Sequence, residues 1–202
     1  MKRIILALFL NAILAFFIPL KSYATHLMGG SMTYEYMGMV GADQSYLVTL
    51  KIYRYCDASA GGTAPLDASM FLGIYNQDVL NPNADKNWFR TENLPLVSSS
   101  FVTPPSIGSN CSFTTTVCVE EGIFEAIILV PPDPGGYHLI VERCCRNGNI
   151  VNLSTPGSIG QTYYCFIPPA PIINSSPQFS DIPVPFILCR RFSIYHQQRY
   201  RS

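Results

Sequence analysis

Apolar and polar residues alternate along much of this chain, and a two-residue period is the signature of a half-buried β-strand. The clearest example covers residues 44–56. Its apolar positions on one side are Tyr46, Val48, Leu50 and Ile52. The positions on the other side include Thr49, Lys51 and Tyr53. We therefore expect a strand whose even-numbered side chains face a core.

Seven further segments are rich in the β-branched and aromatic residues that fit a pleated sheet. They are Ser31–Met39, Met70–Tyr75, Trp88–Thr91, Ser112–Val119, Ile123–Val130, Tyr137–Arg146 and Thr162–Ile167. Turn residues separate them, and no segment combines a helical period with caps at both ends. Short strands at this spacing predict an all-β domain over residues 25–173, built as an antiparallel β-sandwich. Residues 174–202 are expected to be a linker and the truncated start of a second β module.

Residues 1–24 have the composition of a secretory signal peptide. Basic residues open the chain, and residues 4–18 are apolar apart from Asn11. Ser22 and Ala24 supply the small residues of a cleavage site, which predicts a mature chain beginning at Thr25. An uncleaved anchor is the alternative, but the apolar run is shorter than the about 20 residues of a membrane-spanning helix. We expect a secreted or surface-exposed protein without a transmembrane span in its mature part.

The seven cysteines all lie after the predicted cleavage site: Cys56, Cys111, Cys118, Cys144, Cys145, Cys165 and Cys189. Exported cysteines usually form disulfides, and the paired spacings of a zinc site are missing. We expect the first six to be disulfide partners, with reduced, buried thiols as the alternative. Cys144 and Cys145 are expected to point to opposite faces of a strand and to bridge to different partners. Cys189 is the candidate for the unpaired thiol.

The 13 basic and 13 acidic residues balance, but they are unevenly distributed. Residues 25–189 contain all 13 acidic residues and only six basic ones, whereas the last 13 residues contain four arginines and no acid. A formal net charge of zero gives no overall basic field, which argues against nucleic acid as a partner. We expect the basic tail to be the remnant of a truncation or frameshift. A native tail that binds an anionic surface is the alternative.

Few residues in the chain are candidates for catalysis. His138 lies in an alternating segment and is expected to be an ordinary strand side chain, with a cysteine–histidine hydrolase as the alternative. Glu120, Glu121 and Glu125 could act as a carboxylate pair on a glycoside, but charges that protect a sheet edge are the simpler interpretation. Phosphate-binding and calcium-binding loop motifs do not occur. We expect a protein that is not an enzyme and binds no metal or cofactor.

Four segments, taken in order, resemble a known family: Ala24–Tyr34, Val48–Cys56, Pro131–Asn147 and Asn174–Phe179. The most specific part is the run Cys144-Cys145-Arg146-Asn147. Together these segments resemble the amino-terminal region of large adhesin-like surface proteins of gliding bacteria. Such proteins carry immunoglobulin-like or PKD-type repeats and a gliding-motility-associated sorting domain used by type IX secretion.

The resemblance implies an immunoglobulin-like sandwich that serves as the non-catalytic N-terminal module of a cell-surface protein. Its implied role is structural or adhesive, with a link to gliding motility as one option and a surface protein or polysaccharide as partner. The alternative is a carbohydrate-binding accessory module of a secreted hydrolase, in which tyrosines stack on sugars. The tyrosines considered for that role are Tyr34, Tyr36, Tyr163 and Tyr164.

Overall fold

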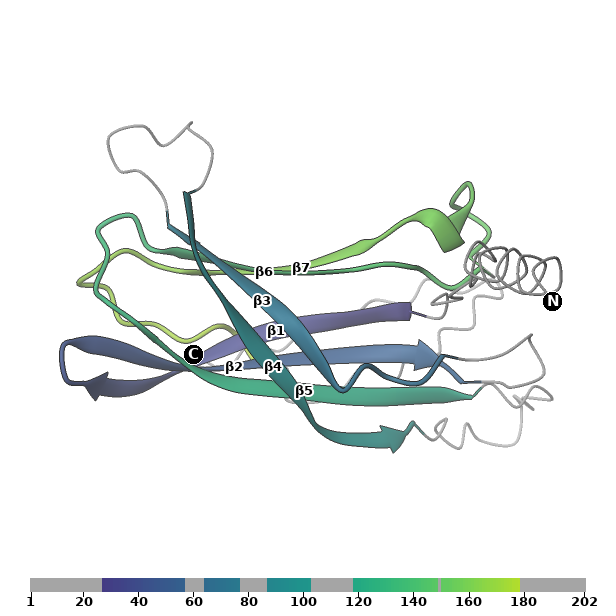
Figure 1. The fold of residues 1–202 in the computed structure, drawn as a ribbon, viewed down its shortest axis with the longest axis horizontal. Coiled ribbons are helices and arrows are strands. Elements are labelled where there is room, and N and C mark those ends of the chain that lie inside the picture. The colour runs from purple at the N-terminus through teal and green to yellow at the C-terminus, as the bar shows by residue number, and fades with distance from the viewer. Residues whose placement is uncertain (1–26, 57–63, 77–86, 103–117, 149, 179–202) are drawn as a thin grey trace, which may run out of the picture.

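The computed structural model describes residues 27–56, 64–76, 87–102, 118–148 and 150–178 (Figure 1). Its strands are β1 (Leu27–Val40), β2 (Asp43–Tyr55), β3 (Ser69–Asn76), β4 (Asn87–Phe101), β5 (Val119–Val130), β6 (Tyr137–Arg143) and β7 (Gln161–Ile167). A short 3-10 turn, η2 (Pro156–Ser158), precedes β7. The all-β prediction is confirmed. The predicted signal peptide with its Ala24–Thr25 cleavage site, Cys111, Cys189 and the basic tail lie outside the described residues.

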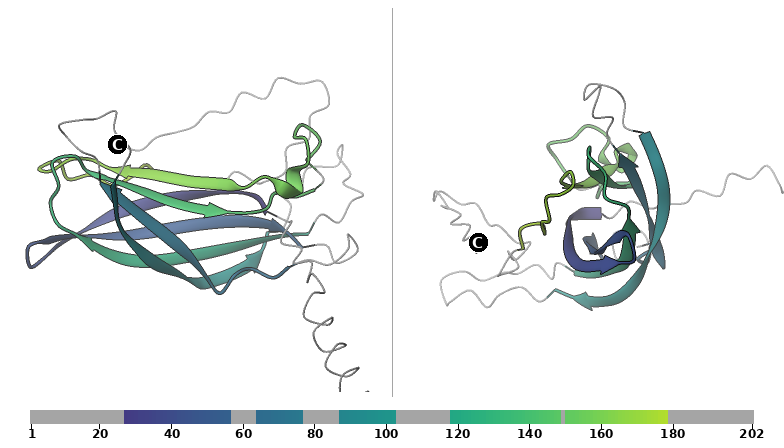
Figure 2. Two further views of the ribbon diagram at one scale, coloured as in Figure 1. Left: turned by 45° about the horizontal axis from the view of Figure 1, so that its top comes forward. Right: turned by 90° about the vertical axis from the view of Figure 1, so that its left-hand side faces the viewer.

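Backbone hydrogen bonds join the strands into one sheet in the order β1-β2-β5-β4-β3-β6-β7. All neighbouring pairs are antiparallel. The sheet curls until its two ends approach each other, as the end-on view in Figure 2 shows. With seven alternating strands, β1 and β7 run in the same direction, and Leu27 forms a parallel bridge to Arg146 beside β7. The sheet is therefore nearly closed, with a seam between β1 and β7.

β4 connects the two halves of the curled sheet. Its residues from Asn87 to Pro95 pair with β3, and those from Leu96 to Phe101 pair with β5. The register shifts between Leu96 and Ser98, directly after the proline. Proline has no N–H to donate to a ladder, so it fits a position where pairing changes from one neighbour to the other. Irregular strands of this kind form the corners of two-layer β structures.

Side chains from both halves meet in one core inside the curled sheet. The even-numbered positions of β2 from Tyr46 to Ile52 are fully buried, as the alternation predicts. Inward residues of the other strands complete this core, including Leu72, Ile74, Phe124, Ile128 and Leu139. Full burial of such a side chain stabilises the fold by roughly 1.5–3 kcal/mol before the entropy cost of ordering it.

Several strand limits differ from the sequence prediction. β4 was predicted as Trp88–Thr91 but continues to Phe101, because pairing with β5 compensates for the weak strand propensity of its serines. β6 ends at Arg143 and does not reach Arg146. Most of the predicted strand Ser112–Val119 lies outside the described residues, and Val119 begins β5.

The seam is filled by close contacts between β1 and the segment around and after β7. A Cβ on Gly30 would lie 2.2 Å from the Lys51 carbonyl oxygen and 2.8 Å from the Tyr163 ring, so only glycine fits where these strands approach. The Gln161 side chain donates to the Leu27 carbonyl at 3.1 Å. Ser175 and Ser176, which the sequence analysis assigns to the linker, bind the backbone of β1. The contacts of the β domain thus include residues beyond 173.

Candidate functional site

Rings line up on the outer face of the sheet half formed by β4, β3, β6 and β7. The strand register places Tyr75 opposite both Trp88 and His138, and it places His138 opposite Phe166. Directly opposed residues in neighbouring strands project from the same face. Trp88, Tyr75, His138 and Phe166 therefore follow one line across four strands, and we call them the aromatic row.

The aromatic row presents apolar surface to solvent. Trp88 is 65% exposed, and Tyr164, two residues before Phe166 on β7, is 52% exposed. Tyr75 and Phe166 are half-buried. His138 is buried and stacks against Tyr164, with ring centroids 5.8 Å apart. The two exposed rings, Trp88 and Tyr164, make this sheet face a candidate interaction site.

Contacts with neighbours hold the rings in place. The Trp88 indole N–H donates to Thr91 Oγ1 at 3.3 Å. The Tyr75 ring lies over Gly73, since a Cβ there would come within 2.7 Å of a ring carbon. His138 Nδ1 shares a hydrogen bond of 2.7 Å with the Tyr164 hydroxyl, and the Phe166 ring centroid lies 4.7 Å from that of His138. Contacts within the chain thus fix the rings of the row in position.

The tyrosines considered for sugar stacking fall mostly in the core. Tyr34 and Tyr163 are buried, and Tyr36 packs partly buried against the core, so only Tyr164 presents its ring to solvent. Burial raises the pKa of Tyr34 and of Tyr163 to about 12. The stacking role is therefore wrong for the two buried tyrosines. Sequence reasoning missed Tyr75, Trp88 and Phe166 because their alignment depends on the pairing of distant strands.

The edge-charge interpretation is wrong for Glu120 and Glu121, because this part of β5 is paired with β2 on one side and with β4 on the other. The pairing with β4 ends at Phe124, so Glu125 is paired with β2 alone. Each carboxylate is bound by a β2 side chain. Glu120 forms an ion pair with Arg54. Glu121 accepts a hydrogen bond from the Tyr53 hydroxyl and Glu125 accepts one from Thr49, each at 2.9 Å. The three glutamates thus tie β5 to β2.

His138 and the free thiol of Cys165 project from opposite faces of the sheet. Cys165 pairs with inward-facing Leu139, whereas His138 pairs with Phe166 on the outer face. Burial raises the pKa of Cys165 to about 12, so its thiolate does not form near neutral pH. These two residues therefore do not make up the cysteine–histidine dyad that the sequence left open.

The structure contains the disulfides Cys56–Cys118 and Cys144–Cys145, and the Cys165 thiol is free. Cys56–Cys118 joins the end of β2 to the residue before β5. The expectation that Cys144 and Cys145 bridge to different partners is wrong. It assumed a strand through both residues, but β6 ends before them, so strand alternation does not separate their side chains.

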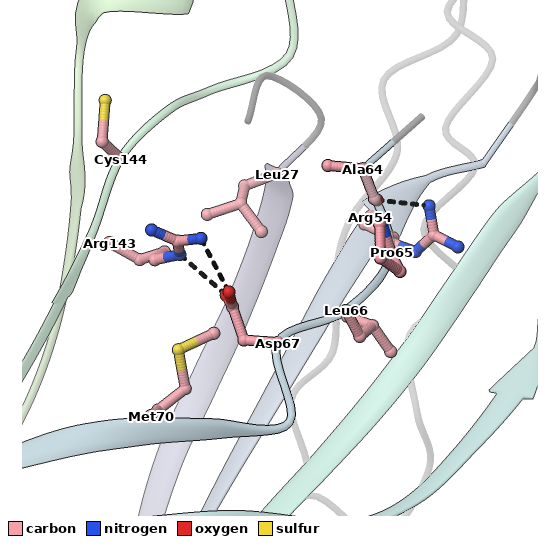
Figure 3. A pocket seen from close by; sticks show the side chains of 9 residues that line it. All are labelled: Leu27, Arg54, Ala64, Pro65, Leu66, Asp67, Met70, Arg143 and Cys144. Atoms are coloured by element: carbon pink, nitrogen blue, oxygen red, sulfur yellow. Dashed lines mark hydrogen bonds and ion pairs between the residues drawn. The ribbon is translucent and has the colours of Figure 1, made fainter. Parts of the chain in front are cut away.

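A small cavity lies at one end of the sheet, between Leu27, Arg54, Asp67 and Arg143 (Figure 3). Asp67 accepts two hydrogen bonds of 2.8 Å from Arg143, and Arg54 donates to the Ala64 carbonyl at 2.9 Å. The volume of about 30 Å³ holds little more than a water molecule. Its charges are paired, so this cavity is a structural feature.

A larger groove of about 530 Å³ lies on the outer face of β1, β2 and β5. Its lining is mostly polar and includes Thr33, Glu35, Thr49, Lys51 and Tyr53. Several of these groups already have partners: Thr49 binds Glu125, and the Tyr53 hydroxyl binds Glu121. The aromatic row, on the other half of the sheet, is the stronger candidate because Trp88 and the neighbouring Tyr164 present exposed ring surface there.

Within the described ranges, no three His, Cys, Asp or Glu side chains gather as they would around a metal ion. No helix in this part of the chain is long and apolar enough to cross a membrane. No protein-family model, no curated protein and no solved structure matches the chain. Functional proposals therefore rest on its own sequence and geometry.

Proposed function

We propose that this chain is a non-catalytic, adhesive module of a secreted cell-surface protein, and that it adheres through the outer face of β4, β3, β6 and β7. The observation that carries the proposal is the aromatic row with its exposed neighbour Tyr164. Rings fixed on a rigid sheet lose little conformational entropy when a partner covers them. A surface of this kind favours binding over chemistry.

The strand order supports an immunoglobulin-like sandwich as the underlying fold. In the constant-type arrangement, strands A, B, E and D form one sheet and strands C, F and G form the other. The order β1-β2-β5-β4-β3-β6-β7 corresponds to A-B-E-D-C-F-G. Export to an oxidising compartment is supported by the Cys56–Cys118 disulfide and by the signal-like residues 1–24. The link to gliding motility rests on the resemblance alone.

The alternative function is a carbohydrate-binding accessory module of a secreted hydrolase, and the exposed rings of Trp88 and Tyr164 favour it as well. The two functions differ in what the protein holds together. An adhesive module fixes a cell to a surface, whereas an accessory module brings a catalytic domain to its substrate. A test of adhesion with and without flow separates them, since only the first function requires the module to resist a detaching force. Beads that bind a polysaccharide film at rest but detach under flow would favour the accessory module.

Adhesion can be measured with beads that carry the full-length chain and are held against glass or a polysaccharide film under flow. We expect the wild-type chain to retain beads and Trp88→Ala/Tyr164→Ala to release most of them. The matched control is Phe101→Ala/Ile127→Ala, which removes equally exposed apolar side chains from other positions. Equal retention by all three chains, or no retention by the wild type, would contradict the proposal.

A further inference from the structure

We propose that the aromatic row and its neighbour Tyr164 bind a neutral polysaccharide, which lies across β4, β3, β6 and β7. Its sugar rings stack on Trp88, Tyr75 and Tyr164, and the buried His138 supports the Tyr164 ring from below. This inference rests on the proposed adhesive function and names its ligand. It depends on the spacing of the rings, on how they are presented, on the charge around them and on the polar groups beside them.

The spacing of the rings follows from the strands that carry them. Neighbouring strands lie about 4.8 Å apart, so the row from Trp88 on β4 to Phe166 on β7 extends over about 14 Å. This length accommodates more than one pyranose ring in a line. A linear polysaccharide fits such a row better than a compact ligand, which would cover only one or two of the rings.

The rings at the β4–β3 end lie along the sheet. Tyr75 covers Gly73, and the Trp88 indole N–H reaches Thr91, the residue opposite Gly73. Both rings therefore extend along their strands toward the same residue pair, which leaves a ring face available to solvent. The faces of aromatic rings carry partial negative charge and attract the partially positive C–H groups of a pyranose.

Charge and polarity favour a neutral glycan over a nucleic acid, whose bases also stack on rings. Gly73 and Ile140, which follow the row on β3 and β6, carry no formal charge. Phosphodiester chains bind where lysine or arginine neutralises their phosphates, and the acidic body offers few such groups. Hydroxyl-bearing sugars instead need hydrogen-bonding groups near the rings. Thr91 lies beside Trp88, and Asn93 and Thr162 lie further along the outer positions of β4 and β7.

The row contains its own reporter, because Trp88 is the only tryptophan in the chain. Its fluorescence therefore monitors the row alone. We would titrate the full-length chain with three neutral β-1,4-linked polysaccharides, namely hydroxyethylcellulose, glucomannan and xylan, and record Trp88 emission. Affinity electrophoresis in gels containing the same polysaccharides would measure binding of variants that lack the tryptophan.

We expect at least one of the three polysaccharides to shift or quench Trp88 emission with saturation. Trp88→Ala and Tyr75→Ala should each weaken retardation in the gel at least about tenfold, the scale expected for loss of an aromatic anchor. Trp88→Phe, which keeps a ring, should retain most of the binding. Phe101→Ala, which removes an exposed ring outside the row, should bind like the wild type.

Several outcomes would overturn the inference. One is the absence of a saturable response to all three polysaccharides. A second is that Trp88→Ala and Tyr75→Ala leave the retardation of the chain in the polysaccharide gel unchanged. A third is that a second copy of the chain covers the row, which would appear as concentration-dependent dimerisation that Trp88→Ala abolishes. If beads adhere through the row but no polysaccharide binds, the ligand assignment fails and the adhesive function stands. If no beads adhere, the adhesive function itself fails.

Discussion

Ser176 binds both backbone groups of Tyr34 across the seam of the sheet. Its hydroxyl accepts the Tyr34 N–H at 2.8 Å, and its own backbone N–H donates to the Tyr34 carbonyl at 2.9 Å. Ser175 accepts the N–H of Tyr36 at 3.0 Å. An unpaired strand edge at this position would leave these groups open to another chain. The segment after β7 thus replaces a neighbouring strand along the middle of β1.

Ser176→Ala should destabilise the protein by about 1–2 kcal/mol, because it leaves the part-buried Tyr34 N–H without its hydroxyl acceptor. Asn174→Ala is the control, since Asn174 is exposed in the same segment. Urea unfolding of the two variants measures the difference. Equal midpoints for wild type, Ser176→Ala and Asn174→Ala would show that this segment does not support β1.

Removing the Cys56–Cys118 bridge should destabilise the protein by about 2–4 kcal/mol, since the bridge restrains a loop in the unfolded chain. These cysteines are 62 residues apart, whereas Cys144 and Cys145 are neighbours and close almost no loop. Cys56→Ala/Cys118→Ala should therefore lower the melting temperature much more than Cys144→Ala/Cys145→Ala does. A larger effect of the second pair would contradict this loop-length argument.

The sequence predicts the elements of this fold better than their arrangement. The alternation around Leu50 identifies β2 and its inward face, because the period of side-chain direction is a local property. The alignment of Tyr75 with Trp88 and His138 depends on the register between their strands. Tyr75 and His138 are 63 positions apart in the chain, and no local sequence pattern encodes a register over that separation. The same limit applies to Glu121: its charge indicates a sheet edge, but its strand lies inside the sheet.

Tyr46→Phe should be neutral or stabilising by up to about 1 kcal/mol. The Tyr46 hydroxyl is buried and has no hydrogen-bond partner among the described residues, although its ring packs edge-on against those of Tyr34 and Tyr36. Removing an unsatisfied polar atom avoids its desolvation cost. Tyr137→Phe is the matched variant and should destabilise by about 1 kcal/mol, since the Tyr137 hydroxyl donates to the Pro131 carbonyl at 2.9 Å. Thermal melts of both variants measure this contrast, and equal effects would contradict it.

Stability should fall between about pH 10 and pH 12. Burial is the main cause that raises the pKa of Tyr34, Tyr53, Tyr137 and Tyr163 from 10.0 to about 12. In that window the folded protein keeps phenol protons that the unfolded chain has released, so rising pH favours unfolding. Below pH 10 the contribution of these four protonated tyrosines to the stability of the folded protein is fully present. Thermal melts across this range, with phenolate absorbance recorded in parallel, test the sign. Full phenolate absorbance near pH 10 with unchanged melting temperatures would contradict it.

The most direct test of the aromatic row is its register, measured by cross-strand nuclear Overhauser contacts in the isotope-labelled, full-length chain. We predict backbone contacts from Tyr75 to both Trp88 and His138, and from His138 to Phe166. A slip of one residue in any of these pairs would turn the ring of that strand toward the core. Contacts displaced by one residue at Tyr75 or His138 would contradict the row, and with it the adhesive face and its polysaccharide ligand.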